Sequence, residues 1–153
     1  NLRAHLGGQP GVLAIRGEQQ VAVFDYNDGK LTQKQLVNFA DGQPVSDKAG
    51  AALHTSSDGK FLYVSNRGTA NQMLVFAIDP ATAQLKEIQR RSVEGDHPRE
   101  FALDPSGKFL LIANQKSNQI VVVERDPKTG LLGKTTQKLA IDAPSDLKFL
   151  VRH

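Results

Sequence analysis

A repeat of about 48 residues is the feature that most limits what this chain can fold into. Residues 57–66 read SDGKFLYVSN and residues 105–114 read PSGKFLLIAN. Their glycines, Gly59 and Gly107, are 48 positions apart, and a downstream DPAT recurs as DPKT 47 positions later. A weaker first copy aligns at Gly11, 48 positions before Gly59. Three copies therefore account for most of the 153 residues.

Each copy predicts four short strands. In the third copy we expect them near 101–103, 109–114, 120–125 and 131–141. These runs are rich in Val, Ile, Leu and Phe and are bounded by Gly, Pro, Asp and Asn, which favours strands joined by tight turns. Residues 30–36 include helix formers without a sustained apolar stripe, so no helix is expected. Four strands repeated every 40–50 residues or so are typical of a β-propeller blade.

Competing all-β folds fit the repeat less well. A sandwich does not predict self-similarity over 48 residues, and a β-helix needs a much shorter period. The predicted fold is an all-β β-propeller with repeats at 1–50, 51–97 and 98–144, followed by a closing strand at 145–150. Because propellers contain roughly four to eight blades, we expect these three blades to be the C-terminal part of a single, longer propeller domain.

The composition excludes several functional classes. The chain is 39% hydrophobic and 23% charged, as in a soluble globular protein, and its net charge of +3 is dispersed. No nucleic-acid partner is expected, and no apolar run approaches the roughly 20 residues of a membrane helix. The absence of Cys excludes a disulfide framework and a thiol nucleophile. No ligand pattern suggests a metal, and no cofactor is expected.

The repeat predicts which polar residues meet. Residues eight positions before and after each turn glycine lie at the same end of an antiparallel strand pair. These positions hold Arg99 and Gln115 in the third copy, and Arg67 in the second. In the first copy they hold Arg3 and Gln19, with Glu18 beside Gln19. Because the innermost strand of each blade lines the central channel, these side chains should converge on one rim, with His54 and His97 nearby.

Three arginines, a carboxylate and imidazoles suit an anionic substrate with a reactive carbonyl. Arginine forks bind phosphate or carboxylate and stabilise an oxyanion, and a glutamate can act as a general base. Other interpretations stay open at this point. Exposed arginines are commonly solvated, and the recurring Asn66 and Asn114 can serve blade geometry alone. A propeller rim can also bind partners without catalysis.

Several segments resemble one known family. They are GAALH at 50–54, SDGKFLYVSNRG at 57–68, HPREFALD at 97–104 and GKFLLIANQ at 107–115. They resemble the bacterial 6-phosphogluconolactonase family of seven-bladed β-propellers, and APSD at 143–146 is similar to its closing strand. The resemblance implies a cytoplasmic hydrolase of a small anionic sugar-acid lactone, such as 6-phosphogluconolactone of the pentose phosphate pathway. The family also includes a carboxy-cis,cis-muconate lactonising enzyme, so a lactonising isomerase is the alternative, and a non-catalytic interaction module is another.

The resemblance also implies residue roles. Carried onto matching positions, the catalytic residues would be Arg3, Glu18 and Arg67. From their predicted places near the rim, and not from the resemblance, we expect His54, Asn66, His97, Arg99 and Gln115 to bind the substrate. The first copy departs from the family pattern, with NLRA at 1–4 where Gly-Pro-Arg-His is usual and Gly17-Glu18 where an Asn-Glu pair is usual. We expect the three-blade fragment to be inactive alone and to self-associate through its open faces.

Overall fold

The computed structural model describes residues 4–6, 9–16, 19–39, 50–150 and 152. Within these residues there are strands and no helices, in three antiparallel sheets of four consecutive strands each. We call the sheets the first, second and third blades. The first contains β1 (Ala4–Leu6), β2 (Gln9–Arg16), β3 (Gln20–Asn27) and β4 (Lys30–Asn38). The second contains β5 (Gly50–Thr55), β6 (Phe61–Asn66), β7 (Gln72–Ile78) and β8 (Leu85–Ser92). The third contains β9 (Pro98–Leu103), β10 (Phe109–Asn114), β11 (Gln119–Arg125) and β12 (Leu132–Ala140).

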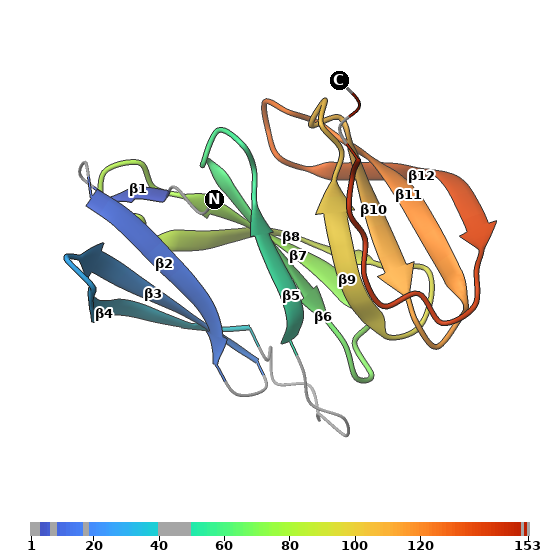
Figure 1. The fold of residues 1–153 in the computed structure, drawn as a ribbon, viewed down its shortest axis with the longest axis horizontal. Coiled ribbons are helices and arrows are strands. Elements are labelled where there is room, and N and C mark those ends of the chain that lie inside the picture. Colours follow the sequence, from blue (N-terminus) through green and yellow to red (C-terminus); the bar gives the residue numbers. More distant parts are fainter. Residues whose placement is uncertain (1–3, 7–8, 17–18, 40–49, 151, 153) are drawn as a thin grey trace.

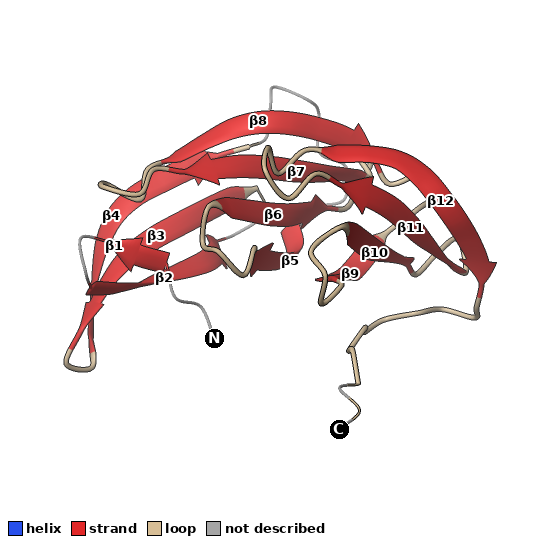
Figure 2. Ribbon diagram, turned by 90° about the horizontal axis from the view of Figure 1, so that it is seen from above, coloured by secondary structure: helices blue, strands red, loops and turns tan. Residues whose placement is uncertain are grey.

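The three blades lie side by side in an arc (Figures 1 and 2). The first strands of the second and third blades, β5 and β9, lie on its concave side and contact each other. The fourth strands, β4, β8 and β12, lie along its convex side. This is the arrangement of part of a β-propeller, and the predicted fold class is confirmed.

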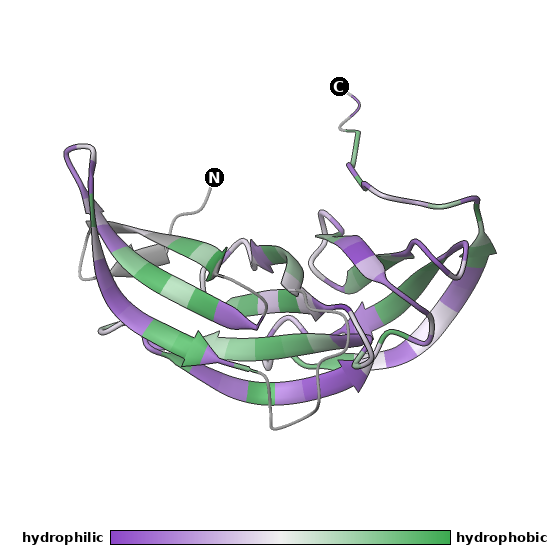
Figure 3. Ribbon diagram, turned by 90° about the horizontal axis from the view of Figure 1, so that it is seen from below, coloured by the Kyte–Doolittle hydropathy of each residue, from purple (hydrophilic) through white to green (hydrophobic). Residues whose placement is uncertain are grey.

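Burial follows the position of a strand within its blade. Every residue of β6 is buried, because the sheet is covered on both faces by neighbouring blades. The convex-side strands are hydrophilic, β12 being largely exposed and β8 half-buried to exposed, whereas the middle strands are hydrophobic (Figure 3). Middle strands therefore lack the apolar–polar alternation of a sheet with one wet face.

The spacing of the repeat holds between the second and third blades. Strands β6 and β10 start 48 residues apart, and both turn glycines, Gly59 and Gly107, adopt a φ of +73°. These glycines close the turns before β6 and β10, where a side chain would strain the backbone. The predicted segments 109–114, 120–125 and 131–141 agree with β10, β11 and β12 to within one residue at each end.

The alignment of the first copy is wrong. Gly11 lies inside β2, paired with Ala4 and Asp25, and not in a turn. Strand β2 is eight residues long and begins at Gln9, so Gly11 is its third residue. The residue that matches Asn66 and Asn114 is Arg16, because each of the three pairs with the first residue of the following strand. Position 17, and not Gln19, therefore corresponds to Arg67.

Residues 144–150 carry no strand and pair with none of the three sheets. They run past β9 on the concave side of the arc (Figures 1 and 2). The predicted closing strand at 145–150 is therefore not formed with these sheets. Its expected partners are strands of a further blade, so it stays a prediction.

Candidate active site

Two adjacent blades bring polar residues to one end of their inner strands. Arg67 directly follows β6, Gln115 directly follows β10, His97 precedes β9 and Arg99 lies within it. Because β6 and β10 run antiparallel to the inner strands β5 and β9, the ends of the former meet the starts of the latter. This places the four residues at the same rim of the arc.

A direct contact joins the two blades at this rim. Nη1 of Arg67 donates to Nε2 of His97 across 3.1 Å. Arginine has no acceptor, so His97 accepts at Nε2 and carries its own proton on Nδ1. The backbone of His97 is fixed as well, because its N–H donates to Oδ1 of Asn71 at 3.0 Å and its carbonyl accepts from the N–H of Gln115 at 3.0 Å. His97 is held at a φ of +62° by these bonds.

The charges at this rim are mainly positive. Burial, and then the nearby charge of Arg99, lower the pKa of Arg67. The pKa of His97 is also lowered, first by burial and then by Arg67, Lys116 and Arg99, against a smaller opposing effect of Asp96. His97 therefore favours its neutral form between cations, and the excess of positive charge suits an anion. We call Arg67, His97, Arg99 and Lys116 the rim cluster.

A β-bulge positions Arg99. Along β9, Glu100 pairs with Ala113 but Pro98 pairs with Asn114, which leaves Arg99 as the extra residue. Strand β5 carries a bulge at the corresponding place, between Gly50 and Leu53. Bulges re-aim side chains and are common beside functional sites. Here the bulge leaves the Arg99 side chain exposed at the rim.

Two buried amides lie behind the rim cluster. Asn66 and Asn114 end β6 and β10 and are 2% and 0% exposed. Nδ2 of Asn114 donates to the carbonyl of Val93 at 2.9 Å, which ties the β8–β9 loop to β10. The Oδ1 atoms of both asparagines and Nε of Arg67 have no hydrogen-bond partner among the described residues. Gly95 lies so close to this loop contact that a Cβ there would be 2.4 Å from Nδ2 of Asn114.

Three of the predicted site residues are not among those that the structure places at this rim. Arg3 and Glu18 fall outside the described residues. His54 is not part of the rim cluster, because its Nε2 bonds Oε1 of Glu100 at 2.7 Å further along the inner strands. The proposed roles of Asn66, Arg67, His97, Arg99 and Gln115 remain predictions, although the structure brings the last four together.

The sequence argument missed Lys116, Asn71, Asp96 and Glu100. Lys116 and Glu100 directly follow predicted site residues, so their positions in the repeat gave a usable signal. Asp96 directly precedes the predicted site residue His97 and gave the same kind of signal, whereas Asn71 gave none. Their side chains bond each other at 3.1 Å, Nδ2 of Asn71 donating to Oδ1 of Asp96.

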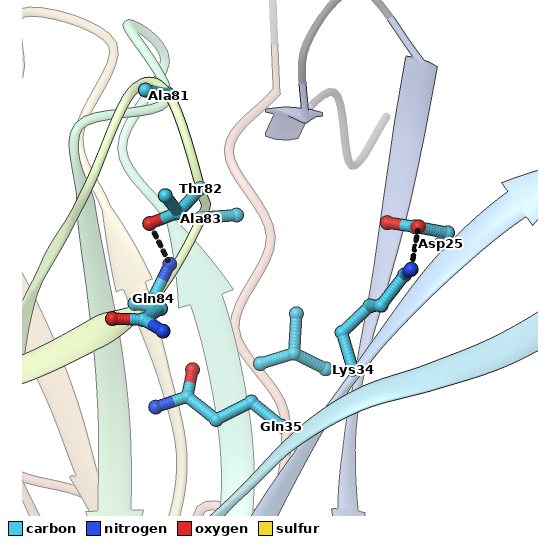
Figure 4. A pocket seen from close by; sticks show the side chains of 8 residues that line it. Asp25, Lys34, Gln35, Ala81, Thr82, Ala83 and Gln84 are labelled. Carbon is cyan, nitrogen blue, oxygen red and sulfur yellow. Dashed lines mark hydrogen bonds and ion pairs between the residues drawn. The ribbon is translucent and has the colours of Figure 1, made fainter.

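A separate groove lies between the first and second blades (Figure 4). It is lined by Val23, the ion pair of Asp25 and Lys34 at 3.1 Å, Gln35 and the turn 81–84. None of the predicted site residues lines it. Elsewhere in the described chain, no group of three or more His, Asp or Glu side chains is arranged to hold a metal ion. No helix of the described residues is long and apolar enough to cross a membrane.

Comparison with known proteins identifies the family. Residues 17–149 match the model of the lactonase family described as a seven-bladed β-propeller. The chain belongs to the seven-bladed lactonase family. Among curated lactonase relatives, a 6-phosphogluconolactonase of Formosa agariphila is 43% identical over 130 residues, and that of Bacillus subtilis is 32% identical over 133. These matches cover 78% and 86% of this chain, but 37% and 38% of the relatives.

A solved lactonase structure agrees. The periplasmic gluconolactonase of Pseudomonas aeruginosa is 48% identical with a TM-score of 0.83, covering 88% of this chain and 37% of that one. The chain thus spans less than two fifths of each of these relatives. These relatives are named as lactonases of sugar acids. One of them is named periplasmic, so the relatives do not decide the predicted cytoplasmic location.

Proposed function

We propose that the protein carrying this chain is a cytoplasmic hydrolase of a sugar-acid lactone, with the rim cluster binding the anionic part of the substrate. The observation that carries the proposal is the contact of Arg67 with His97 beside Arg99 at one rim. Membership of the lactonase family supports the same substrate class. The rim cluster contains two guanidinium groups and little compensating negative charge. Guanidinium groups bind phosphate or carboxylate through two parallel hydrogen bonds.

The rim cluster supports two chemical roles. Arg99, exposed at the bulge, would bind the phosphate or the hydroxyls of the sugar acid. Arg67 is held by His97 and partly withdrawn from water, so its charge acts more strongly on a nearby oxyanion than a solvated charge would. Gln115, which directly follows β10 at the same rim, would assist binding.

The test uses the full-length protein carrying this sequence, with 6-phosphogluconolactone and unphosphorylated gluconolactone as parallel substrates. Proton release above the spontaneous rate gives kcat and KM. Arg67→Ala should lower kcat/KM about a hundredfold, the effect of losing an oxyanion donor. Arg99→Ala should raise KM for the phosphorylated lactone more than for the unphosphorylated one. Lys128→Ala, in an exposed turn remote from the rim, is the control.

The outcomes separate the alternatives. A wild-type protein that does not accelerate hydrolysis of either lactone would contradict the proposed function. Turnover of a carboxylated muconate lactone in its place would favour the lactonising isomerase. Activity that is insensitive to Arg67→Ala would remove the rim cluster from the site.

A further inference from the structure

A histidine and a glutamate meet on the concave side, where the second and third blades adjoin. His54 lies on β5 and Glu100 on β9, the innermost strands of the two blades. Nε2 of His54 is 2.7 Å from Oε1 of Glu100. The His54 side chain is 42% exposed and that of Glu100 is 19% exposed. The imidazole is therefore accessible from the concave side, while its carboxylate partner is largely enclosed.

The hydrogen bonds define which nitrogen of His54 is free to act. Oε1 of Glu100 also accepts the backbone N–H of Phe101 at 2.8 Å, so this oxygen is an acceptor in both contacts. Nε2 of His54 is then the donor, and Nδ1 of the neutral ring carries the lone pair. The ring also packs edge-on against Phe101, with centroids 4.8 Å apart and an interplanar angle of 84°. Two contacts thus fix the orientation of the imidazole and leave Nδ1 as a base.

The pair lies further from the rim than the guanidinium groups. His54 pairs with Tyr63 on β6. Tyr63 lies three residues before Asn66, which ends β6 and is directly followed by Arg67. Three residues of strand span about 10 Å. Glu100 directly follows Arg99 on β9, so one strand connects the rim to the pair. A sugar-acid lactone with its phosphate and its carbonyl at opposite ends can span these places, with the phosphate at Arg99 and the carbonyl between Arg67 and His54.

Other charged groups near the pair come from the tail. Asp146 acts electrostatically on His54 from a distance, because His54 contributes to lowering the pKa of Asp146. Lys148 lies near Glu100 and bonds Asp146 at 2.7 Å. These tail groups neutralise each other, and neither bonds His54 or Glu100 directly in any contact of the described residues. The pair therefore depends on the two blades and not on the tail.

We infer that His54, oriented by Glu100, is the general base of lactone opening. Water attacks the carbonyl carbon while Nδ1 of His54 takes one of its protons. The tetrahedral intermediate then expels the ring oxygen, and the C–O bond of the lactone breaks. The proton on His54 passes to that oxygen, which becomes the hydroxyl group of the open-chain acid. In this scheme Glu100 is a positioning residue, and the base is His54 instead of Glu18.

This inference rests on the proposed function, and the experiment separates the two. In the full-length protein, His54→Ala should lower kcat on 6-phosphogluconolactone about a hundredfold or more, with KM nearly unchanged, because general bases contribute roughly 10²–10⁴ in rate. Added imidazole should restore part of the lost rate, because a free base can enter the space of the deleted ring. Glu100→Gln keeps a hydrogen-bond partner for His54 and should lower kcat less than His54→Ala does.

Three controls make the result decisive. Thermal unfolding of each variant shows whether the fold is kept, and His54→Gln offers a less disruptive replacement. Glu18→Gln is the matched variant for the competing base. If the wild type hydrolyses the lactone and His54→Ala retains its kcat, this inference fails and the proposed function stands. Loss of kcat without rescue by imidazole, together with a large loss in Glu18→Gln, would also overturn it. A wild type without lactonase activity would overturn both.

Discussion

The two interfaces between blades are built differently. The first and second blades meet through an apolar cluster that includes Val23, Phe39, Leu62, Leu74 and Phe76. The second and third blades share a similar apolar cluster but insert buried polar groups into it. There the hydroxyl of Tyr63 donates to the carbonyl of Gly130 at 2.6 Å and accepts from Nε of Arg125 at 2.5 Å. Arg125 is only 7% exposed.

The difference concerns how closely each interface fixes the position of its blades. Apolar contacts are non-directional, so volume and patterning suffice to hold the first interface. A buried guanidinium needs partners in specific directions. Arg125 also donates to the carbonyl of Gly107 at 2.8 Å and lies over the Phe61 and Tyr63 rings, while its Nη2 has no hydrogen-bond partner among the described residues. The interface that carries His54, Glu100 and the rim cluster is therefore the one with a hydrogen-bonded guanidinium buried in its core.

The largest expected effect falls on the apolar interface. Phe76 is 1% exposed within its cluster, so Phe76→Ala should destabilise the full-length protein by about 3–5 kcal/mol through lost burial and a cavity. Guanidinium denaturation measures the change, and Phe76→Leu should lose much less. A loss below 1 kcal/mol, as expected for a surface site, would contradict the importance of this cluster.

Gly130→Ala tests close packing at the interface of the second and third blades. A Cβ there would lie 2.4 Å from Cδ1 of Phe61, and the backbone adopts a φ of +74°. Strain and overpacking together should cost roughly 2–4 kcal/mol. Gly29→Ala is the matched control, because its φ is +76° but nothing lies within 4 Å. Equal losses in the two variants, measured by thermal unfolding, would show that the Phe61 contact contributes nothing.

Tyr63→Phe removes only the hydroxyl at the same interface. It leaves the Gly130 carbonyl and Nε of Arg125 without their buried partner, which should cost about 1–3 kcal/mol. Hydrogen exchange should report faster opening between the second and third blades than between the first and second. Uniform protection across both interfaces would contradict the distinction between them.

At both interfaces a glutamine side chain of one blade bonds the backbone of the next blade. Oε1 of Gln89 accepts the N–H of Leu132 at 2.7 Å, and its Nε2 donates to the Leu132 carbonyl at 2.8 Å. Gln35 similarly accepts the N–H of Leu85 at 3.0 Å. Gln89→Ala should cost roughly 1–2 kcal/mol and Gln35→Ala less, because Gln35 makes one of the two bonds. Urea midpoints would rank the two variants, and the reverse order would contradict this account.

The smallest effect concerns pH. The folded-state pKa of His97 is below its unfolded value of 6.5, so unfolding takes up a proton as the pH falls through that range. Stability from His97 is complete above pH 6.5 and declines as the pH falls toward the folded-state pKa. His97→Gln should flatten this slope in denaturation series between about pH 5 and 7. An unchanged slope would show that other groups cause it.

Much of the fold could be predicted from the sequence, because each strand of the second and third blades is bounded by local turn chemistry. Residues 109–114 were predicted with the bounds of β10. The first blade was misaligned because one glycine was taken for a turn. Gly11 has no local feature that separates a strand position from a turn position.

The site was less predictable than the fold. Arg67, His97 and Arg99 could be brought together by counting residues within a repeat. The contact of His54 with Glu100 joins two repeats at different positions, and it depends on how the blades pack. Spacing within one blade contains no information about that packing, so the contact of His54 with Glu100 could not be predicted from the repeat.

The bulge in β5 absorbs one extra residue without changing the pairing that follows it. Gly50 pairs with Asn66 and Leu53 with Val64, so three steps along β5 match two steps along β6. Deleting a single residue between Gly50 and Leu53 would therefore remove the bulge and leave Leu53 and His54 opposite Val64 and Tyr63. The length of the strand before the bulge can thus change while the imidazole of His54 keeps its place opposite Glu100.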